Sequence, residues 1–205
     1  MRKKLRILAL VIIAVLLIRE YAIKRSKTAV PEPIADAPTD SAPIGETTRG
    51  STIGPISGSG LQPTGETASC IVDRIVDGDT INCEPVGRIR LIGMDTPERG
   101  QKPFGPQATA ALTAMAPIGS ELLIEFDVDR IDRYDRILGY LWKDGELLNW
   151  RLVREGYALL ATYPPNVRYT DQFLTAQEAA REDAAGLWAV DGFACEPSSF
   201  RRGDC

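Results

Sequence analysis

The chain has 205 residues, of which 44% are hydrophobic and 25% are charged, so it can form at least one globular domain. It has no histidine and no CxxC pair, which excludes the usual zinc sites. The net charge of −4 divides into +3 for residues 1–69 and −7 for residues 70–205. The C-terminal part is therefore not expected to bind nucleic acid by charge alone.

Residues 1–27 combine basic residues with an apolar run of twelve residues, Ile7 to Ile18. The run could be a buried core helix, but no amphipathic segment follows that could pack against it. It is shorter than the roughly 20 residues of a spanning helix, although continuing it to Ile23 with Arg19 and Glu20 snorkelling brings it closer. Because no small-residue cleavage site follows closely, we expect an export signal retained as a membrane anchor. The remainder would face the periplasm or the cell exterior, or be secreted.

Residues 28–69 are rich in Pro, Gly, Ser and Thr and contain no aromatic residue. Such a segment cannot bury enough apolar surface to offset its chain entropy. We interpret it as a disordered linker.

The four cysteines all lie in the part expected to be exported, where disulfides form. Four cysteines permit three pairings. Cys70 and Cys83 flank a predicted hairpin, and Cys195 and Cys205 flank the tail, so the local pairs are preferred. Four free thiols would be natural only in the cytosol.

Residues 70–190 form the expected folded domain. Short apolar stretches separated by Asp-Gly and Val-Gly turns predict three strands from residue 70 to about 95. A helix follows from Pro106, then two further strands with a turn at Lys143–Gly145. Helical patterns begin near residue 150, ending near Gly156, and again at Asp171. Five strands and about three helices predict an α+β protein built on a Greek-key barrel of the OB type.

Four motifs in this domain occur together: DGDT at 77–80, RLIGMDTPE at 90–98, DRYDRILGY at 132–140 and LVREGYALL at 152–160. In order and approximate spacing they resemble the staphylococcal (thermonuclease-type) nuclease family, from about residue 71 to residue 188. Each motif is weak alone, and the set of four is specific. The resemblance implies an OB-type barrel and hydrolysis of phosphodiester bonds.

The residues themselves fit this chemistry. Without histidine, a hydrolase must use carboxylates as base and metal ligands, and arginine as electrophile. Asp79 and Asp95 are hard oxygen donors suited to Ca²⁺ or Mg²⁺. Arg90 and Asp95 are five residues apart, which places them on opposite faces of a flat strand. A bend, for example at Gly93, is needed to bring them together.

The resemblance implies sharper roles. Asp79, Asp95 and the carbonyl of Thr96 would hold Ca²⁺, and Glu98 would be the general base on the attacking water. Arg90 and Arg136 would neutralise the transition state and assist the 5′-oxygen leaving group. The substrate would be DNA or RNA, cut endonucleolytically to 3′-phosphate ends.

Each residue has a structural alternative. Asp77 is read as a turn residue, Arg90 could snorkel from a sheet edge, and Glu98 could cap a helix. Arg136 could pair with Asp132, Asp135 or their neighbours in a solvated run of charges. Tyr134 and Tyr163 could stack on bases or pack at the rim.

The later helices offer fewer functional candidates. Arg154 and Asp183 are interpreted as an ion pair between two of these helices, and Trp188 as core. Residues 191–205, a tail with two cysteines, receive no role.

Two functions compete. The first is an exported, membrane-tethered Ca²⁺-dependent nuclease, and the second is a non-catalytic OB-type module that binds nucleic acid or protein. The presence of Glu98 together with Arg90 and Arg136 favours the nuclease, because a binding module needs no base. The acidic charge of residues 70–205 favours the binding module. No obligate protein partner is evident.

Overall fold

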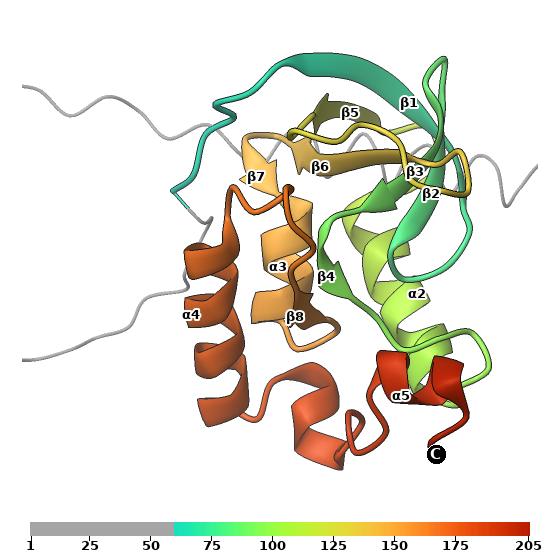
Figure 1. Ribbon diagram of the computed structural model, residues 1–205, viewed down its shortest axis with the longest axis vertical. Helices are drawn as coiled ribbons and strands as arrows, with labels where there is room; N and C mark the ends of the chain where they lie inside the picture. The colour runs from blue at the N-terminus through green and yellow to red at the C-terminus, as the bar shows by residue number, and fades with distance from the viewer. Residues whose placement is uncertain (1–59) are drawn as a thin grey trace, which may run out of the picture. The chain divides into compact units, whose positions relative to one another are not determined.

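The computed structural model describes residues 60–205 (Figure 1). The expected anchor, residues 1–27, lies outside the described residues, as does most of the expected linker. Among the residues that are described, no helix is long and apolar enough to cross a membrane.

Five strands form a closed barrel. In the order in which they pair they are β3 (Gly87–Leu91), β2 (Thr80–Glu84), β1 (Thr67–Ile75), β5 (Glu121–Glu125) and β6 (Ile137–Lys143). These neighbours are antiparallel, and a parallel pairing of β3 with β6 closes the barrel. This is the predicted five-stranded OB-type architecture. Two short strands, β4 (Gly93–Asp95) and β8 (Leu159–Ala161), pair separately.

Helices cover the barrel below and beside its lower end (Figure 1). They are α2 (Phe104–Met115), α3 (Leu148–Arg154), α4 (Thr170–Glu182) and α5 (Pro197–Arg202), with the 3₁₀ helix η1 (Gly186–Val190). The first three match the predicted helices. The third ends at Glu182, because Ala184 has a positive φ of 47° and the chain then forms the separate helix η1.

The local sequence explains several of these boundaries. Asp144 and Gly145 both have positive φ, as the two-residue hairpin turn between β6 and β7 (Glu146–Leu147) requires. Gly156, with φ of 76°, follows the end of α3 in the manner of a glycine helix stop.

The main core fills the barrel and its contact with α2 and α3. It contains the inward side chains of the strands, among them Val72, Ile81, Ile89, Leu122 and Ile124. A second cluster packs β6 against α4 through four aromatic residues: Tyr140, Trp142, Tyr169 and Phe173. Trp188, predicted to be core, is partly buried and packs against Phe193 in a third cluster.

The folded domain begins earlier than the expected boundary at residue 70. Strand β1 starts at Thr67, and the backbone N–H groups of Thr64 and Gly65 each donate to Glu125 Oε1 at 2.8 Å. The end of the expected linker is therefore part of the domain.

Both preferred cysteine pairs are present. Cys70 is bonded to Cys83 between β1 and β2, and Cys195 is bonded to Cys205 across the tail. The predicted ion pair between Arg154 and Asp183 also forms, at 2.6 Å.

Candidate active site

Two buried carboxylates lie at the centre of the candidate site. Asp79 ends the turn between β1 and β2, and Asp95 ends β4; they are 6% and 4% exposed. The guanidinium of Arg90 forms an ion pair with Asp79, and its Nη2 donates to Asp95 Oδ1 at 2.8 Å. A single arginine thus connects the two predicted metal ligands.

The backbone bends between Arg90 and Asp95, as predicted. Gly93 has φ of 78°, in the region that favours glycine, and it is the first residue of β4, one residue after the end of β3 at Leu91. A Cβ there would lie 2.3 Å from Phe173 Cε2. Gly93 therefore allows both the change of direction and the close approach of α4.

Hydrogen bonds hold Asp79 in place. Its Oδ2 accepts from Thr96 Oγ1 at 2.9 Å and from Thr96 N at 3.3 Å, and its Oδ1 accepts from Thr80 Oγ1 at 3.0 Å. Asp77 Oδ1 accepts from the backbone N–H of Asp79 at 3.2 Å, as the side chain of a turn residue does. Thr96 therefore lies beside Asp79 as the sequence predicts.

Glu98 lies in the loop between β4 and α2, with its carboxylate partly exposed. Its backbone N–H donates to Gln101 Oε1 at 2.7 Å. Helix α2 has no side-chain cap, so the alternative in which Glu98 caps this helix is wrong. The Glu98 carboxylate is instead directed at the cluster around Asp95.

Arg136 comes from the residue before β6, the strand that pairs with β3 next to Arg90. Its Nε and Nη2 atoms contact Asp132 Oδ2 at 2.7 and 2.6 Å, so the alternative pairing with Asp132 does occur. Burial would raise the pKa of Asp132, but hydrogen bonds from Arg136 and Tyr134 hold it below its usual value. Asp132 thus keeps the Arg136 side chain in a fixed place.

The charge of Arg136 acts on Arg90. Burial lowers the pKa of the Arg90 guanidinium, the charge of Asp95 raises it, and the charge of Arg136 lowers it. The two predicted electrophiles thus come from β3 and from the residue before its partner strand β6, on the same side of the barrel as Asp95.

Both candidate stacking residues are accessible. Tyr134 is 63% exposed and Tyr163 is 64% exposed. The guanidinium groups of Arg133 and Arg136 lie over the Tyr134 ring, 4.8 and 5.5 Å from its centroid. Tyr134 thus borders the arginine side of the site.

Sequence reasoning missed Arg201, which reaches the same carboxylates from α5. Its Nη2 donates to Asp95 Oδ2 at 2.6 Å, and its Nη1 donates to Glu98 Oε1 at 2.6 Å. The hydrogen bond with Asp95 raises the pKa of Arg201. No local pattern marks this residue, because its partners lie 103 and 106 positions earlier in the chain. The two cysteines around it were the only available signal.

The donor chemistry of the site fits a hard cation. Asp79 and Asp95 offer buried carboxylate oxygens, and Thr96, between them and Glu98, offers a backbone carbonyl. Oxygen-only donors of this kind are those that Ca²⁺ prefers. Within residues 60–205 no group of three or more His, Cys, Asp or Glu side chains is arranged to hold a metal, so this set of two carboxylates and a carbonyl is the candidate.

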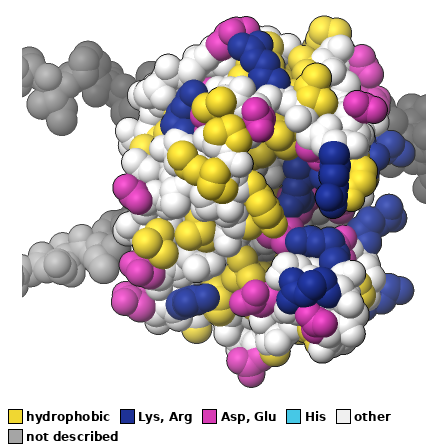
Figure 2. All heavy atoms as spheres, in the orientation of Figure 1, with side chains coloured by type: hydrophobic (Ala, Val, Ile, Leu, Met, Phe, Trp, Pro, Cys, Tyr) yellow, Lys and Arg dark blue, Asp and Glu magenta, His cyan; other side chains and the backbone are white. Residues whose placement is uncertain are grey.

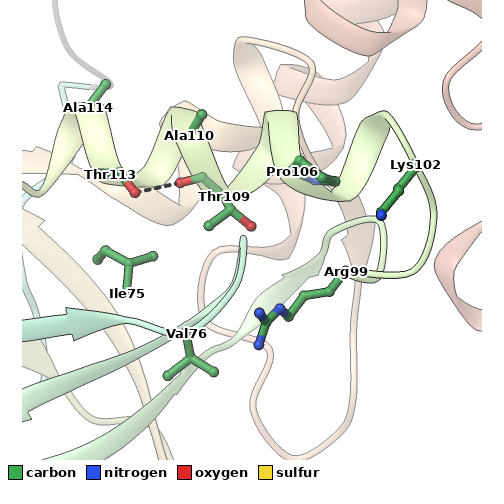
Figure 3. A pocket seen from close by; sticks show the side chains of 9 residues that line it. All are labelled: Ile75, Val76, Arg99, Lys102, Pro106, Thr109, Ala110, Thr113 and Ala114. Atoms are coloured by element: carbon green, nitrogen blue, oxygen red, sulfur yellow. Dashed lines mark hydrogen bonds between the residues drawn. The ribbon is translucent and has the colours of Figure 1, made fainter.

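Basic side chains lie near the site although the domain as a whole is acidic. Figure 2 shows Lys and Arg side chains gathered on the right of this face, from α5 upward, with Asp and Glu side chains between them. A groove of about 780 Å³ lies between the end of β1 and α2 (Figure 3). Arg99 and Lys102 line one end of it, and Arg99 directly follows Glu98 in the chain.

Known nucleases are similar in sequence to this chain. The family model described as "Staphylococcal nuclease homologue" matches residues 88–190. A thermonuclease of Staphylococcus intermedius is 36% identical over 142 residues, which cover 66% of this chain and 83% of the relative. A thermonuclease of Staphylococcus hyicus is 32% identical over 144 residues, covering 66% and 84%. The endonuclease YncB of Bacillus subtilis is 35% identical over 132 residues, covering 60% and 62%.

Proposed function

The chain belongs to the staphylococcal nuclease homologue family and is a nuclease, and from that premise we propose that it is a Ca²⁺-dependent endonuclease of DNA or RNA. Its products would carry 3′-phosphate ends. The observation that carries the proposal is a connected cluster in which Arg90 joins Asp79 to Asp95 and Arg201 joins Asp95 to Glu98.

The residues divide the chemistry among them. Glu98 accepts the proton of the water that attacks phosphorus, and the 5′-oxygen leaves from the opposite side. Glu98 suits this role because its carboxylate is partly exposed and can reach water. Arg90 and Arg136 donate hydrogen bonds to the phosphate oxygens as negative charge develops on them.

Asp79, Asp95 and the Thr96 carbonyl would hold the Ca²⁺. When bound, the ion supplies positive charge that offsets the charge of the reacting phosphate. Asp79 is already oriented for such a role, because Thr80 and Thr96 fix both of its oxygens.

The surroundings of the site support a polymeric substrate. Tyr134 and Tyr163 are exposed aromatic surfaces on which bases can stack, and Arg99 and Lys102 add phosphate-binding charge beside Glu98. Base stacking and phosphate binding do not depend on the nucleotide sequence of the substrate, as a general nuclease requires.

We also propose that the protein is exported and tethered to a membrane through residues 1–27. The two disulfides in the described domain support export, because such bonds persist in oxidising compartments.

The metal assignment is tested with Asp79→Asn, which keeps the side-chain size and removes the charge. Isothermal titration of the full-length variant should show Ca²⁺ affinity reduced at least tenfold, and cleavage of DNA should be lost with it. Asp73→Asn is the matched control, since Asp73 is exposed on β1. Unchanged Ca²⁺ affinity in Asp79→Asn would show that the ligand assignment is wrong.

A further inference from the structure

The C-terminal helix α5 places a third arginine in the site. Arg201 Nη1 and Nη2 donate to Asp95 Oδ1 and Oδ2 at 3.1 and 2.6 Å, a two-pronged pairing with the carboxylate. Its Nη1 also donates to Glu98 Oε1 at 2.6 Å. Arg201 therefore joins a proposed metal ligand to the proposed base.

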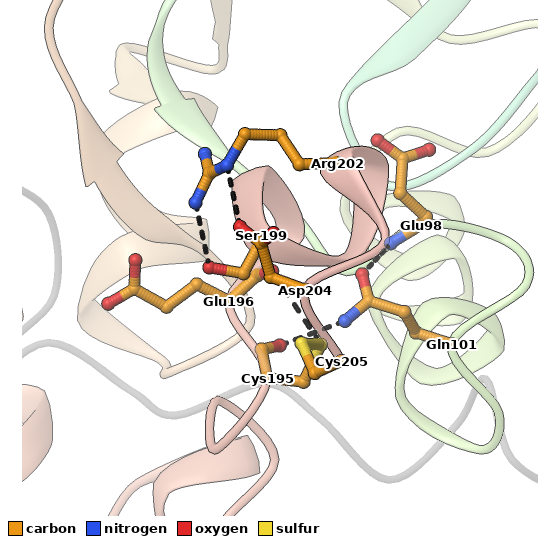
Figure 4. The surroundings of a disulfide bond; sticks show 8 residues. All are labelled: Glu98, Gln101, Cys195, Glu196, Ser199, Arg202, Asp204 and Cys205. Carbon is orange, nitrogen blue, oxygen red and sulfur yellow. Dashed lines mark hydrogen bonds and ion pairs between the residues drawn. A yellow bond between two sulfur atoms is a disulfide. The ribbon is translucent and has the colours of Figure 1, made fainter.

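This placement is fixed by three independent connections. The Cys195–Cys205 disulfide closes the tail around α5, and Gln101 Nε2 donates to the carbonyl of Cys195 at 2.9 Å (Figure 4). The same Gln101 accepts the backbone N–H of Glu98. The Phe200 ring lies against Gly100, 3.2 Å from where a Cβ would be. The loop that carries the base and the tail that carries Arg201 are thus held together.

Arg201 and a metal ion need the same oxygens. Asp95 Oδ1 accepts from Arg90 and Arg201, and its Oδ2 accepts from Arg201. A divalent cation that ligates Asp95 has to share these oxygens with the guanidinium groups, and the positive charges of Arg201 and the ion repel each other. The pairing of Arg201 with Asp95 therefore opposes binding of the ion.

We propose that Arg201 is a further residue of the active site that competes with the divalent cation for Asp95, so that the disulfide-closed tail sets the cation concentration at which the site loads. This inference rests on the proposed function, because it takes Asp95 as a metal ligand. Arg201 acts through Asp95 and Glu98 and is a positioning residue.

The disulfide makes the competition effective. Cys195 and Cys205 are ten positions apart, and their bond keeps Arg201 within reach of Asp95 after it has been displaced. The disulfide restricts the tail and so raises the effective concentration of Arg201 at Asp95 above that in an open tail. Cys205 is exposed whereas Cys70 and Cys83 are buried, so reductants reach the tail bond before the barrel bond.

The test is Ca²⁺ affinity measured by calorimetry on the full-length protein. An opposite charge within about 4–6 Å changes the proton affinity of a carboxylate by about 10- to 1000-fold. Because the Arg201 side chain is 40% exposed, we expect the lower end, a Kd about tenfold tighter in Arg201→Gln than in the wild type. Arg202→Gln is the matched control, since Arg202 on the same helix pairs with Asp204 and Ser199. Its Kd should equal that of the wild type.

Two further variants separate charge from geometry and tether. Arg201→Lys keeps the charge but loses the two-pronged pairing, so its Kd should lie between those of the wild type and Arg201→Gln. The Kd of Cys195→Ser/Cys205→Ser should also lie between those two values, because this variant releases the tail but still contains Arg201. A wild-type Kd in this double variant would overturn the part assigned to the disulfide.

The outcomes distinguish this inference from the proposed function. A wild-type Kd in Arg201→Gln, with Ca²⁺-dependent cleavage intact, would overturn the competition and leave the nuclease mechanism standing. Tighter Ca²⁺ binding in Arg201→Gln without cleavage by the wild type would support the competition and overturn the proposed reaction. Absence of Ca²⁺ binding in every variant would overturn both.

Discussion

Glu125 is the most completely satisfied buried charge of the described domain, and replacing it should destabilise the fold. Its side chain is fully buried at the end of β5. Oε1 accepts from Thr64 N, Gly65 N and Arg168 Nη1 at 2.8, 2.8 and 2.6 Å. Oε2 accepts from Trp142 Nε1 and Tyr169 OH at 2.9 and 2.8 Å. One carboxylate on β5 thus links the segment before β1, strand β6 and the residues at the start of α4.

The size of the effect follows from this donor set. Glu125→Gln keeps the shape but turns an amide NH₂ group toward N–H or O–H donors. At least one buried donor is then left without an acceptor, which lowers the folding stability by about 1–3 kcal/mol. It also removes the charge that pairs with Arg168. Breaking a buried ion pair from one side costs about 3–5 kcal/mol, and the partial exposure of Arg168 reduces that figure. We expect a loss of about 3 kcal/mol, or a Tm lower by roughly 10 °C.

Urea denaturation followed by tryptophan fluorescence measures this loss directly. Glu121→Gln on the same strand is the control, because Glu121 is exposed and its change should cost less than about 0.5 kcal/mol. A loss below about 1 kcal/mol in Glu125→Gln would refute the reasoning, since it would mean that the five donors find water or other partners as readily.

Three further outcomes are expected. Burial would raise the pKa of Glu125, but its hydrogen bonds hold that pKa below the usual 4.5. The ionised carboxylate therefore stabilises the fold fully above pH 4.5, and this contribution is lost as the pH falls through the lowered pKa. The stability of the wild type should thus fall more steeply with acid than that of Glu125→Gln. Arg136→Lys should lower kcat about 10²-fold because lysine lacks the planar guanidinium fork, whereas Arg133→Lys should change kcat little. A wild-type kcat in Arg136→Lys would mean that Arg136 only pairs with charges at the surface. Gly93→Ala should cost about 2–4 kcal/mol from its positive φ and its collision with Phe173, and an unchanged Tm would contradict that account.

Much of the barrel and of the central site could be predicted because the signals are local. Asp-Gly turns, alternating strands and the need for a bend at Gly93 are all properties of short stretches. The disulfide pairs could be predicted for the same reason, since Cys70 and Cys83 flank one hairpin and Cys195 and Cys205 flank one short tail.

What could not be predicted depends on contacts between distant segments. The folded domain extends to Thr64 and Gly65 because their backbone N–H groups donate to a buried carboxylate 61 and 60 residues away. Amino-acid composition indicates how much apolar surface a segment can bury, and it carries no sign of such a hydrogen bond. Arg201 lies on a six-residue helix too short for a periodic pattern, and its partners lie 103 and 106 positions earlier in the chain. Neither contact leaves a mark in the neighbouring sequence.

In the proposed reaction Glu98 is the base of a Ca²⁺-dependent phosphodiester cleavage. This role can be tested by the rate at which the full-length protein cuts single-stranded DNA with Ca²⁺ and with a chelator, for the wild type and for Glu98→Gln. We expect cleavage to 3′-phosphate ends with Ca²⁺ and none with chelator. Glu98→Gln should be slower by about 10²–10⁴ while still binding DNA. Cleavage by Glu98→Gln at the wild-type rate, or cleavage that persists in chelator, would contradict it.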